Sequence, residues 1–487
     1  MKRVDLSHGT RSLAVNAGQL AASRMLGHAA RGLYMLLVAR ALGPQLYSLF
    51  AVAQAWYMAL IPLAAFGLAG VLAREIGRGK EPSQDLIDSS AVLALTATLA
   101  ACLISILGAY LIHGESELAV LLFIMTAALA GRAVSLWTTH VFIAVEKSRL
   151  VLVLESIFRP LEIFFGLTVL YFDGGIIGLS IVHGALWWIQ GFCGLYLIHR
   201  ELGFKLRIRA TWTATKRIVG HAMPFLMAGL LMNWLLQGPL VLFSKADIDP
   251  AVIGNFAIAI QVLHLAIAFP QSLSSAALPV ITRAADRKDG KDKLFLGVTF
   301  KIALFTGCLA GFFGTTVGPW LVPLILGDEY RLTGDILGWI LCLLAPAAII
   351  FVFPATFYAR GMNLTSTIAS LIGSVLLTAL ALSDSIHGLE LSGILIALSV
   401  ALTASACYLI VSAVRHDLIQ LGDEVLRPIA AAIAATLIFV MLLPLNGWVA
   451  LAGGTVGLPL LAILTGAIRR TEIEAVRGAI SRSKTGA

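Results

Sequence analysis

Three nitrogen-bearing side chains stand at helical spacing in the first apolar stretch of the sequence. Arg24, His28 and Arg31 occupy positions i, i+4 and i+7. At ~100° per residue, these positions fall on one face of a helix. Arginine offers bidentate hydrogen bonds as well as charge, so such a face suits a phosphate, a diphosphate or another anion. We expect it to line a cationic cavity. The alternatives are a first helix that lies flat along an interface and a structural ion pair.

Further charges interrupt two later apolar stretches. Arg132 has no acidic residue three or four positions away, so we assign it to the same cavity, with Glu155 as an alternative partner. Glu155, Arg159 and Glu162 share one face of a helix, where the arginine can pair locally with a glutamate. Two interpretations stay open for this trio: a structural ion pair, or a role in coupling or substrate contact. His183 and His264 are interpreted as packing residues with satisfied hydrogen bonds.

The composition predicts which solvent surrounds these charges. Of the 487 residues, 59% are hydrophobic and 13% are charged, and the charged share is about half the ~25% of an ordinary soluble domain. These values exclude a water-soluble enzyme, a disordered protein and a coiled coil, and they predict an all-α polytopic membrane protein. Fourteen stretches reach the ~20 apolar residues that cross a bilayer. They cover residues 13–40, 45–72, 87–112, 117–145, 149–171, 175–198, 218–244, 251–281, 294–320, 332–358, 364–383, 389–413, 425–444 and 447–468.

A bilayer makes a buried arginine costly. Arg24 lies about 16 Å into its stretch at ~1.5 Å per residue. An arginine at that depth costs at least ~2.5–3.5 kcal/mol on insertion scales, so it should face a cavity or a partner.

Basic residues predict the orientation of the chain. With the N-terminus in the cytoplasm, 27 of the 35 Lys and Arg residues fall in cytoplasmic segments, and only Lys245 and Arg331 fall outside. This distribution follows the positive-inside rule. The net charge of +8 therefore needs no nucleic-acid partner, and both termini are expected in the cytoplasm.

An internal repeat predicts two lobes. Residues 44–53 recur as 250–259 with Pro, Phe and two Ala identical. The offset brackets six spans, so both copies enter the membrane in the same direction, as in a transporter of two parallel six-helix lobes. The expected divisions are residues 1–200 and 201–415 for the lobes, 416–470 for two additional helices and 471–487 for a basic cytoplasmic tail.

Other motifs have simpler interpretations. Gly307, Gly311, Gly314 and Gly318 recur every three or four residues, which predicts close helix packing. The five cysteines are dispersed and form no metal-ligand or disulfide pattern. A phosphate-binding P-loop is absent from the sequence. Neither a metal site nor a catalytic site is expected.

The turn between the first two stretches has a family signature. Val38–Ala51, VARALGPQLYSLFA, resembles the ARxLGPxxYGLFA turn of the polysaccharide-biosynthesis flippases, which belong to the MOP superfamily with the MATE exporters and the lipid II flippases. Ile253–Ala259 resembles the VGxYxxA motif of their second lobe, and Leu278–Pro279 resembles the LP that closes that helix. Ser48 replaces a usual glycine, and Gln237 replaces a frequent acidic residue, which weakens the case for cation coupling there.

The resemblance implies a flippase rather than an enzyme. It would move undecaprenyl-diphosphate-linked oligosaccharide from the cytoplasmic to the outer leaflet by alternating access, for O-antigen, capsule or exopolysaccharide synthesis. Arginines of the first helix line the substrate path in this family, so Arg24 and Arg31 are the leading site residues. The expected partners are the lipid-linked substrate, the bacterial inner membrane, and a polysaccharide polymerase with its chain-length machinery. No cofactor is expected, and coupling would use a proton or sodium gradient or the membrane potential.

Two other functions stay open. A MATE-type ion-coupled exporter of small molecules should have an acidic rather than a basic cavity. A membrane polymerase or ligase of the same pathway should have a large external loop with catalytic residues, whereas every predicted external loop is short.

Overall fold

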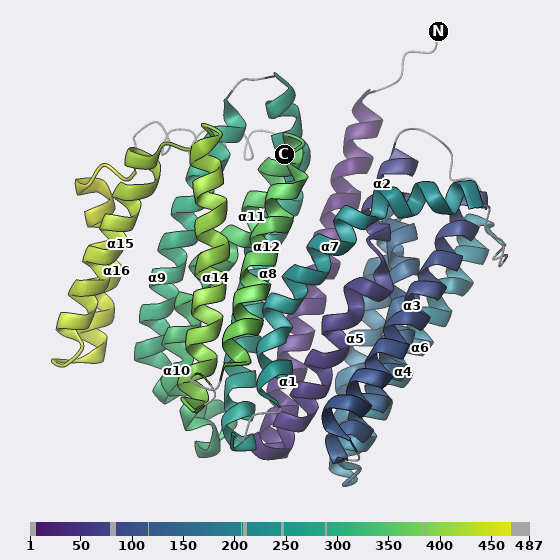
Figure 1. Cartoon of the computed structure of the whole chain (residues 1–487), viewed down its shortest axis with the longest axis horizontal. Helices are drawn as coiled ribbons and strands as arrows, with labels where there is room; N and C mark the ends of the chain where they lie inside the picture. Colours follow the sequence, from purple (N-terminus) through teal and green to yellow (C-terminus); the bar gives the residue numbers. More distant parts are fainter. Residues whose placement is uncertain are drawn as a thin grey trace. The chain divides into compact units, whose positions relative to one another are not determined.

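The computed structural model describes residues 6–77, 84–114, 116–205, 207, 212–244, 248–287, 290–383, 386 and 388–468. Helices dominate these residues, and no strand occurs among them. In chain order the helices are α1 (Leu6–Ala65), α2 (Leu68–Gly77), α3 (Gln84–His113), α4 (Glu117–Ala144), α5 (Ser148–Tyr171), α6 (Gly175–Leu202), α7 (Trp212–Phe243), α8 (Pro250–Arg287), α9 (Lys291–Leu326), η1 (Asp328–Tyr330), α10 (Arg331–Cys342), α11 (Leu344–Ala359), α12 (Asn363–Ala381), α14 (Glu390–Arg415), η2 (Leu421–Leu426), α15 (Arg427–Leu442) and α16 (Gly447–Leu464) (Figure 1).

The helices agree with the fourteen predicted spans. Among the described residues, eleven helices are long and apolar enough to cross a membrane, or twelve if α10 and α11, bent by 42°, form one span. The long helix α1 supplies two predicted spans, because Gly43 adopts φ 70° and ψ 165° inside it. The predicted span at 149–171 is α5, which is too rich in charge to count among the eleven. The chain is therefore a multi-pass membrane protein.

One predicted span is interrupted. The stretch 45–72 breaks at Phe66 and Gly67, which both have positive φ, and the chain continues as α2. A Cβ at Gly67 would lie 2.7 Å from the carbonyl oxygen of Ala222 in α7. Only glycine allows both the left-handed backbone and this close approach, so helix packing rather than hydropathy sets the break.

The chain divides into two compact units, each with its own contacts. The first unit comprises Met1–Ile258 and Ser374–Leu398, and the second comprises Ala259–Gly373 and Ser399–Ala487. The predicted lobes at 1–200 and 201–415, with the additional helices at 416–470, stay predictions. The predicted basic tail at 471–487 lies outside the described residues.

The two copies of the repeated motif touch within the first unit. A Cβ at Gly254 would lie 2.0 Å from the carbonyl oxygen of Pro44, so the two helix starts pack backbone against backbone. Each copy then buries its aromatic residue completely, Phe50 in one and Phe256 in the other. The sequence repeat therefore marks the starts of two helical segments that pack against each other.

Small residues set the packing of the second unit. Along α9, Cβ atoms at Gly307 and Gly314 would come within 2.5 Å of Ala345 and 2.9 Å of Gly338, respectively. This confirms the close packing predicted from the glycine spacing. In the same unit, α15 and α16 form an antiparallel hairpin (Figure 1). Phe312 of α9 stacks on Phe439 of α15 at 4.5 Å between ring centroids.

We predict that Gly338→Ala destabilises the second unit. Its methyl group would lie 2.7 Å from the backbone nitrogen of Thr315, and overpacking of this kind costs about 1–3 kcal/mol. Gly457→Ala in α16 is the matched control, because its Cβ would meet only Ile438, at 3.7 Å. Thermal unfolding in detergent should give a lower midpoint for Gly338→Ala alone. Equal midpoints for the two variants would contradict the packing argument.

Candidate functional site

A cavity of about 380 Å³ opens within the first unit, in the ~300–1,000 Å³ range of small-molecule sites. Its walls come from α1, α2, α4, α5 and α6. The lining residues of α4 and α5, apart from Glu162, belong to the halves of these helices that meet at the short connection around Lys147. The structure brings all seven predicted site residues to this cavity: Arg24, His28, Arg31, Arg132, Glu155, Arg159 and Glu162.

The basic face of α1 lines one wall. Leu20, Ser23, Gly27 and Tyr34 lie on the same wall as the three predicted residues, which gives the spacing expected for a single helix face. Within the described part of the chain, neither Arg24, His28 nor Arg31 has a hydrogen bond or ion-pair partner. The alternative of a structural ion pair therefore finds no support here.

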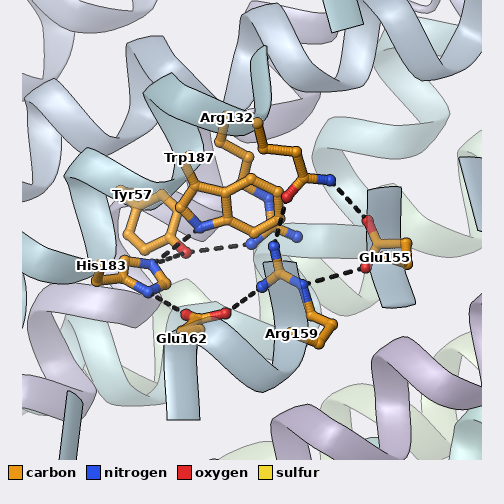
Figure 2. A network of polar contacts seen from close by, with 8 residues as sticks. Tyr57, Arg132, Glu155, Arg159, Glu162, His183 and Trp187 are labelled. Carbon is orange, nitrogen blue, oxygen red and sulfur yellow. Dashed lines mark hydrogen bonds and ion pairs between the residues drawn. The ribbon is translucent and has the colours of Figure 1, made fainter. Parts of the chain in front are cut away.

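The charges of α5 form a buried ion-pair network (Figure 2). Arg159 pairs with Glu155 at 3.1 Å through Nε and with Glu162 through Nη1. Its Nη2 donates to Gln190 Oε1 at 2.7 Å, and Gln190 Nε2 donates to Glu155 Oε1 at 3.0 Å. The charge of Arg159 is therefore neutralised within the wall, and both of its Nη groups donate hydrogen bonds there.

Arg132 does not pair with Glu155, the alternative partner that the sequence suggested; it contacts Tyr57 and Trp187 instead. Its Nη1 donates to the hydroxyl of Tyr57 at 3.1 Å. Its guanidinium carbon lies 4.6 Å from the centre of the Trp187 ring, and that of Arg159 lies 4.2 Å from the same ring. Both contacts have the geometry of cation–π interactions, so Trp187 lies between the ion-paired Arg159 and the hydrogen-bonded Arg132.

A hydrogen-bond chain anchors the Tyr57 hydroxyl (Figure 2). The indole N–H of Trp187 points at His183 Nε2 from 3.2 Å. An indole nitrogen only donates, so Nε2 is the acceptor and Nδ1 carries the proton. His183 Nδ1 then donates to Glu162 at 2.5 Å, and the Tyr57 hydroxyl lies 2.8 Å from Nε2. The chain runs from Arg132 through Tyr57 and His183 to Glu162.

Three of these residues escaped the sequence interpretation, and one was only partly understood. His183 is a satisfied packing residue, as expected, but it also lines the cavity. Trp187 also lines the cavity, whereas Gln190 and Tyr57 belong to the network of polar contacts behind it, and none of the three was expected. His183, Trp187 and Gln190 stand at i, i+4 and i+7, the same spacing that marked α1, so this stripe was a usable signal. Nothing in the sequence near Tyr57 signalled its role.

The charge balance of the cavity favours anions. Its described lining contains four arginines and two glutamates, a formal surplus of two positive charges when the histidines are neutral. In the described residues, no group of three or more His, Cys, Asp or Glu could hold a metal ion. The fold and the site together define a polytopic α-helical membrane protein with a basic internal cavity.

Comparison with known proteins gives the family. Residues 13–285, more than half of the chain, match the family described as "Polysaccharide biosynthesis protein". The chain belongs to this family. No curated protein matches the sequence at a significant level.

Solved structures give the fold. The lipid II flippase MurJ in an inward closed conformation has a TM-score of 0.64 at 16% identity, over 93% of this chain and 98% of its own. An inward-facing multidrug resistance MATE transporter of the MOP superfamily has a TM-score of 0.62 at 16% identity, over 81% and 94% of the two chains. A MOP superfamily transporter from Pyrococcus furiosus, described as having a binding pocket of reverse polarity, has a TM-score of 0.57 at 15% identity, over 83% and 95% of the two chains. The chain therefore has the MATE-like fold.

We predict that Tyr57→Phe destabilises the protein and that Tyr34→Phe does not. Tyr57 exchanges hydrogen bonds with Arg132 and His183, and the loss of a buried hydrogen bond to a charged group costs about 1.5–3 kcal/mol. Tyr34 lines the same cavity, but its buried hydroxyl has no hydrogen-bond partner within the described residues. Thermal unfolding in detergent should show a lower midpoint for Tyr57→Phe only. A similar loss in both variants would refute the hydrogen-bond chain.

Proposed function

We propose that this protein is a flippase for an anionic, lipid-linked oligosaccharide. It carries undecaprenyl-diphosphate-linked sugar from the cytoplasmic to the outer leaflet of the bacterial inner membrane, in the synthesis of O-antigen, capsule or exopolysaccharide. Membership of the polysaccharide biosynthesis family supports the pathway, and the MATE-like fold supports transport. The observation that carries the proposal is the basic wall of the cavity, with Arg24, His28 and Arg31 unpaired within the described residues.

The energetics of the wall argue for an anionic cargo. An arginine inside the membrane costs at least ~2.5–3.5 kcal/mol, and Arg159 offsets this cost by pairing with two glutamates. Arg24 and Arg31 form no ion pair with their described neighbours. A diphosphate diester carries two negative charges, which equals the formal surplus of the cavity, and arginine matches its oxygens with bidentate hydrogen bonds.

The expected orientation fits the direction of transport. The connection between α4 and α5 contains Lys147 and lies next to Arg149, which favours the cytoplasmic side. The lining residues of both helices, apart from Glu162, lie in the halves next to this connection. In that orientation the cavity serves the leaflet in which lipid-linked sugars are made. Coupling to an ion gradient or to the membrane potential, and contact with a polymerase and its chain-length machinery, belong to the same proposal.

The basic lining argues against the other functions. A MATE-type exporter of cationic drugs needs acidic groups that face its cargo, whereas arginines outnumber glutamates two to one in this lining. A polymerase or ligase needs room for catalytic residues outside the membrane. The connections from α3 to α4 and from α5 to α6, which are external in this orientation, have three residues each.

We predict that Arg24→Ala and Arg31→Ala each lower transport by about tenfold or more. A charge-assisted hydrogen bond contributes about 1.5–3 kcal/mol, or roughly 10- to 100-fold. The assay follows a fluorescent, short-chain polyprenyl-diphosphate oligosaccharide in proteoliposomes, as the fraction that an impermeant quencher reaches with time. Arg24→Lys and Arg31→Lys should restore part of the rate, because lysine keeps the charge but not the bidentate geometry.

Arg40→Ala is the matched control for this experiment. Arg40 is exposed, belongs to the same helix and is absent from the cavity lining. It should transport at the wild-type rate and reconstitute equally well. Wild-type rates in both the Arg24 and the Arg31 alanine variants would overturn the proposed function.

A further inference from the structure

Glu155 is the acidic group that stays accessible in the basic cavity. Its side chain is 20% exposed, against 9% for Glu162. Glu155 Oε2 pairs with Arg159 Nε, and Oε1 accepts from Gln190. A carboxylate has about four acceptor positions, so these two contacts leave about half of the acceptor capacity of Glu155 for a ligand.

A missing side chain leaves space beside this carboxylate. Gly27 faces Glu155 across the cavity wall, and a Cβ added there would lie 3.4 Å from Oε2, with no other described atom within 4 Å. Gly27 itself lines the cavity on the basic face, three residues after Arg24 and four before Arg31. The gap is as large as one methyl or hydroxyl group. It lies about 4.5 Å and 6 Å along the helix axis from the two arginines, at ~1.5 Å per residue.

The carboxylate of Glu155 and the space beside Gly27 favour a ligand with a hydrogen-bond donor next to its anionic group. A carboxylate repels the oxygens of a diphosphate, so Glu155 adds nothing to the binding of a bare anion. It attracts an O–H or N–H donor that is held next to the anion. In a glycosyl diphosphate, the hydroxyl and acylamino groups of the first sugar directly adjoin the phosphates.

We propose that Glu155 recognises the first sugar of the substrate, accepting a hydrogen bond from a hydroxyl or amide N–H that enters the gap at Gly27. The basic residues of α1 hold the adjoining diphosphate. This inference rests on the proposed function and deepens it, because the cavity then distinguishes glycosylated carrier lipid from the bare carrier diphosphate. Recycled, sugar-free carrier would bind more weakly than loaded carrier.

The key experiment fills the gap without removing a charge. Gly27→Ala places a methyl group where the donor would enter and leaves the ion pairs of Glu155 in place. Alanine is favoured over glycine inside a helix, so the fold is preserved. Gly18→Ala is the matched control on the same helix, because nothing described lies within 4 Å of its added Cβ.

Two probes separate the sugar from the anion. Calorimetry on the purified full-length protein compares methyl farnesyl diphosphate with the farnesyl diphosphate ester of N-acetylglucosamine. Both are diphosphate diesters with two negative charges, and only the second carries hydroxyl and amide donors. Wild type and Gly18→Ala should bind the sugar ester more tightly. Gly27→Ala should lose about tenfold in affinity for the sugar ester, the value of one charge-assisted hydrogen bond, and stay within twofold for methyl farnesyl diphosphate. Glu155→Gln, which keeps the shape but halves the acceptor groups, should show the same selective loss.

The remaining outcomes of the calorimetry would contradict either sugar recognition by Glu155 or the proposed flippase function. Unchanged affinity of Gly27→Ala for the ester, or an equal loss for both probes, overturns sugar recognition at Glu155. A wild-type protein that binds both probes equally overturns it as well, while the flippase proposal stands. A wild-type protein that binds neither probe refutes the anion-binding cavity, and the proposed function fails with it.

Discussion

The structure of the first unit depends on how it accommodates guanidinium groups inside a membrane. Water compensates an arginine at a protein surface, but a low-dielectric interior requires a counter-charge or a cavity. Arg159 meets this requirement with Glu155, Glu162 and Gln190. The arginines of α1 meet it by facing the cavity. One set of charges is therefore paired within the wall, and the other faces the cavity.

Trp187 and His183 connect Arg132 of α4 to the ion pairs of Arg159. The indole ring contacts the guanidinium groups of both Arg132 and Arg159, and the imidazole links Tyr57 to Glu162. A network of this kind is stable only when every buried member has a partner. The same contacts that stabilise α4, α5 and α6 against one another also fix the direction in which Arg132 points. Stability of the wall and geometry of the site are thus one property.

Close backbone contacts support the helices that carry the site. Gly254 packs on Pro44, where the two copies of the repeated motif meet, and Gly67 packs on Ala222. Such contacts replace the hydrophobic effect, which gives little driving force between helices surrounded by lipid. In the second unit, the glycines of α9 have the same role against α10 and α11. These small residues are structural, in contrast to Gly27, which faces a carboxylate and open space.

The sequence by itself determined the helical class, the spans and the candidate residues. Apolar length predicts a membrane helix whatever surrounds it, and the spacing of Arg24, His28 and Arg31 defines one helix face without any tertiary contact. The sequence could not assign partners. The sequence suggested Glu155 as an alternative partner of Arg132, but Arg132 donates to Tyr57, 75 positions away. The helix expected at 45–72 breaks where Gly67 meets α7. Periodicity records which residues share a face, whereas pairing depends on which faces meet, and only tertiary packing decides that.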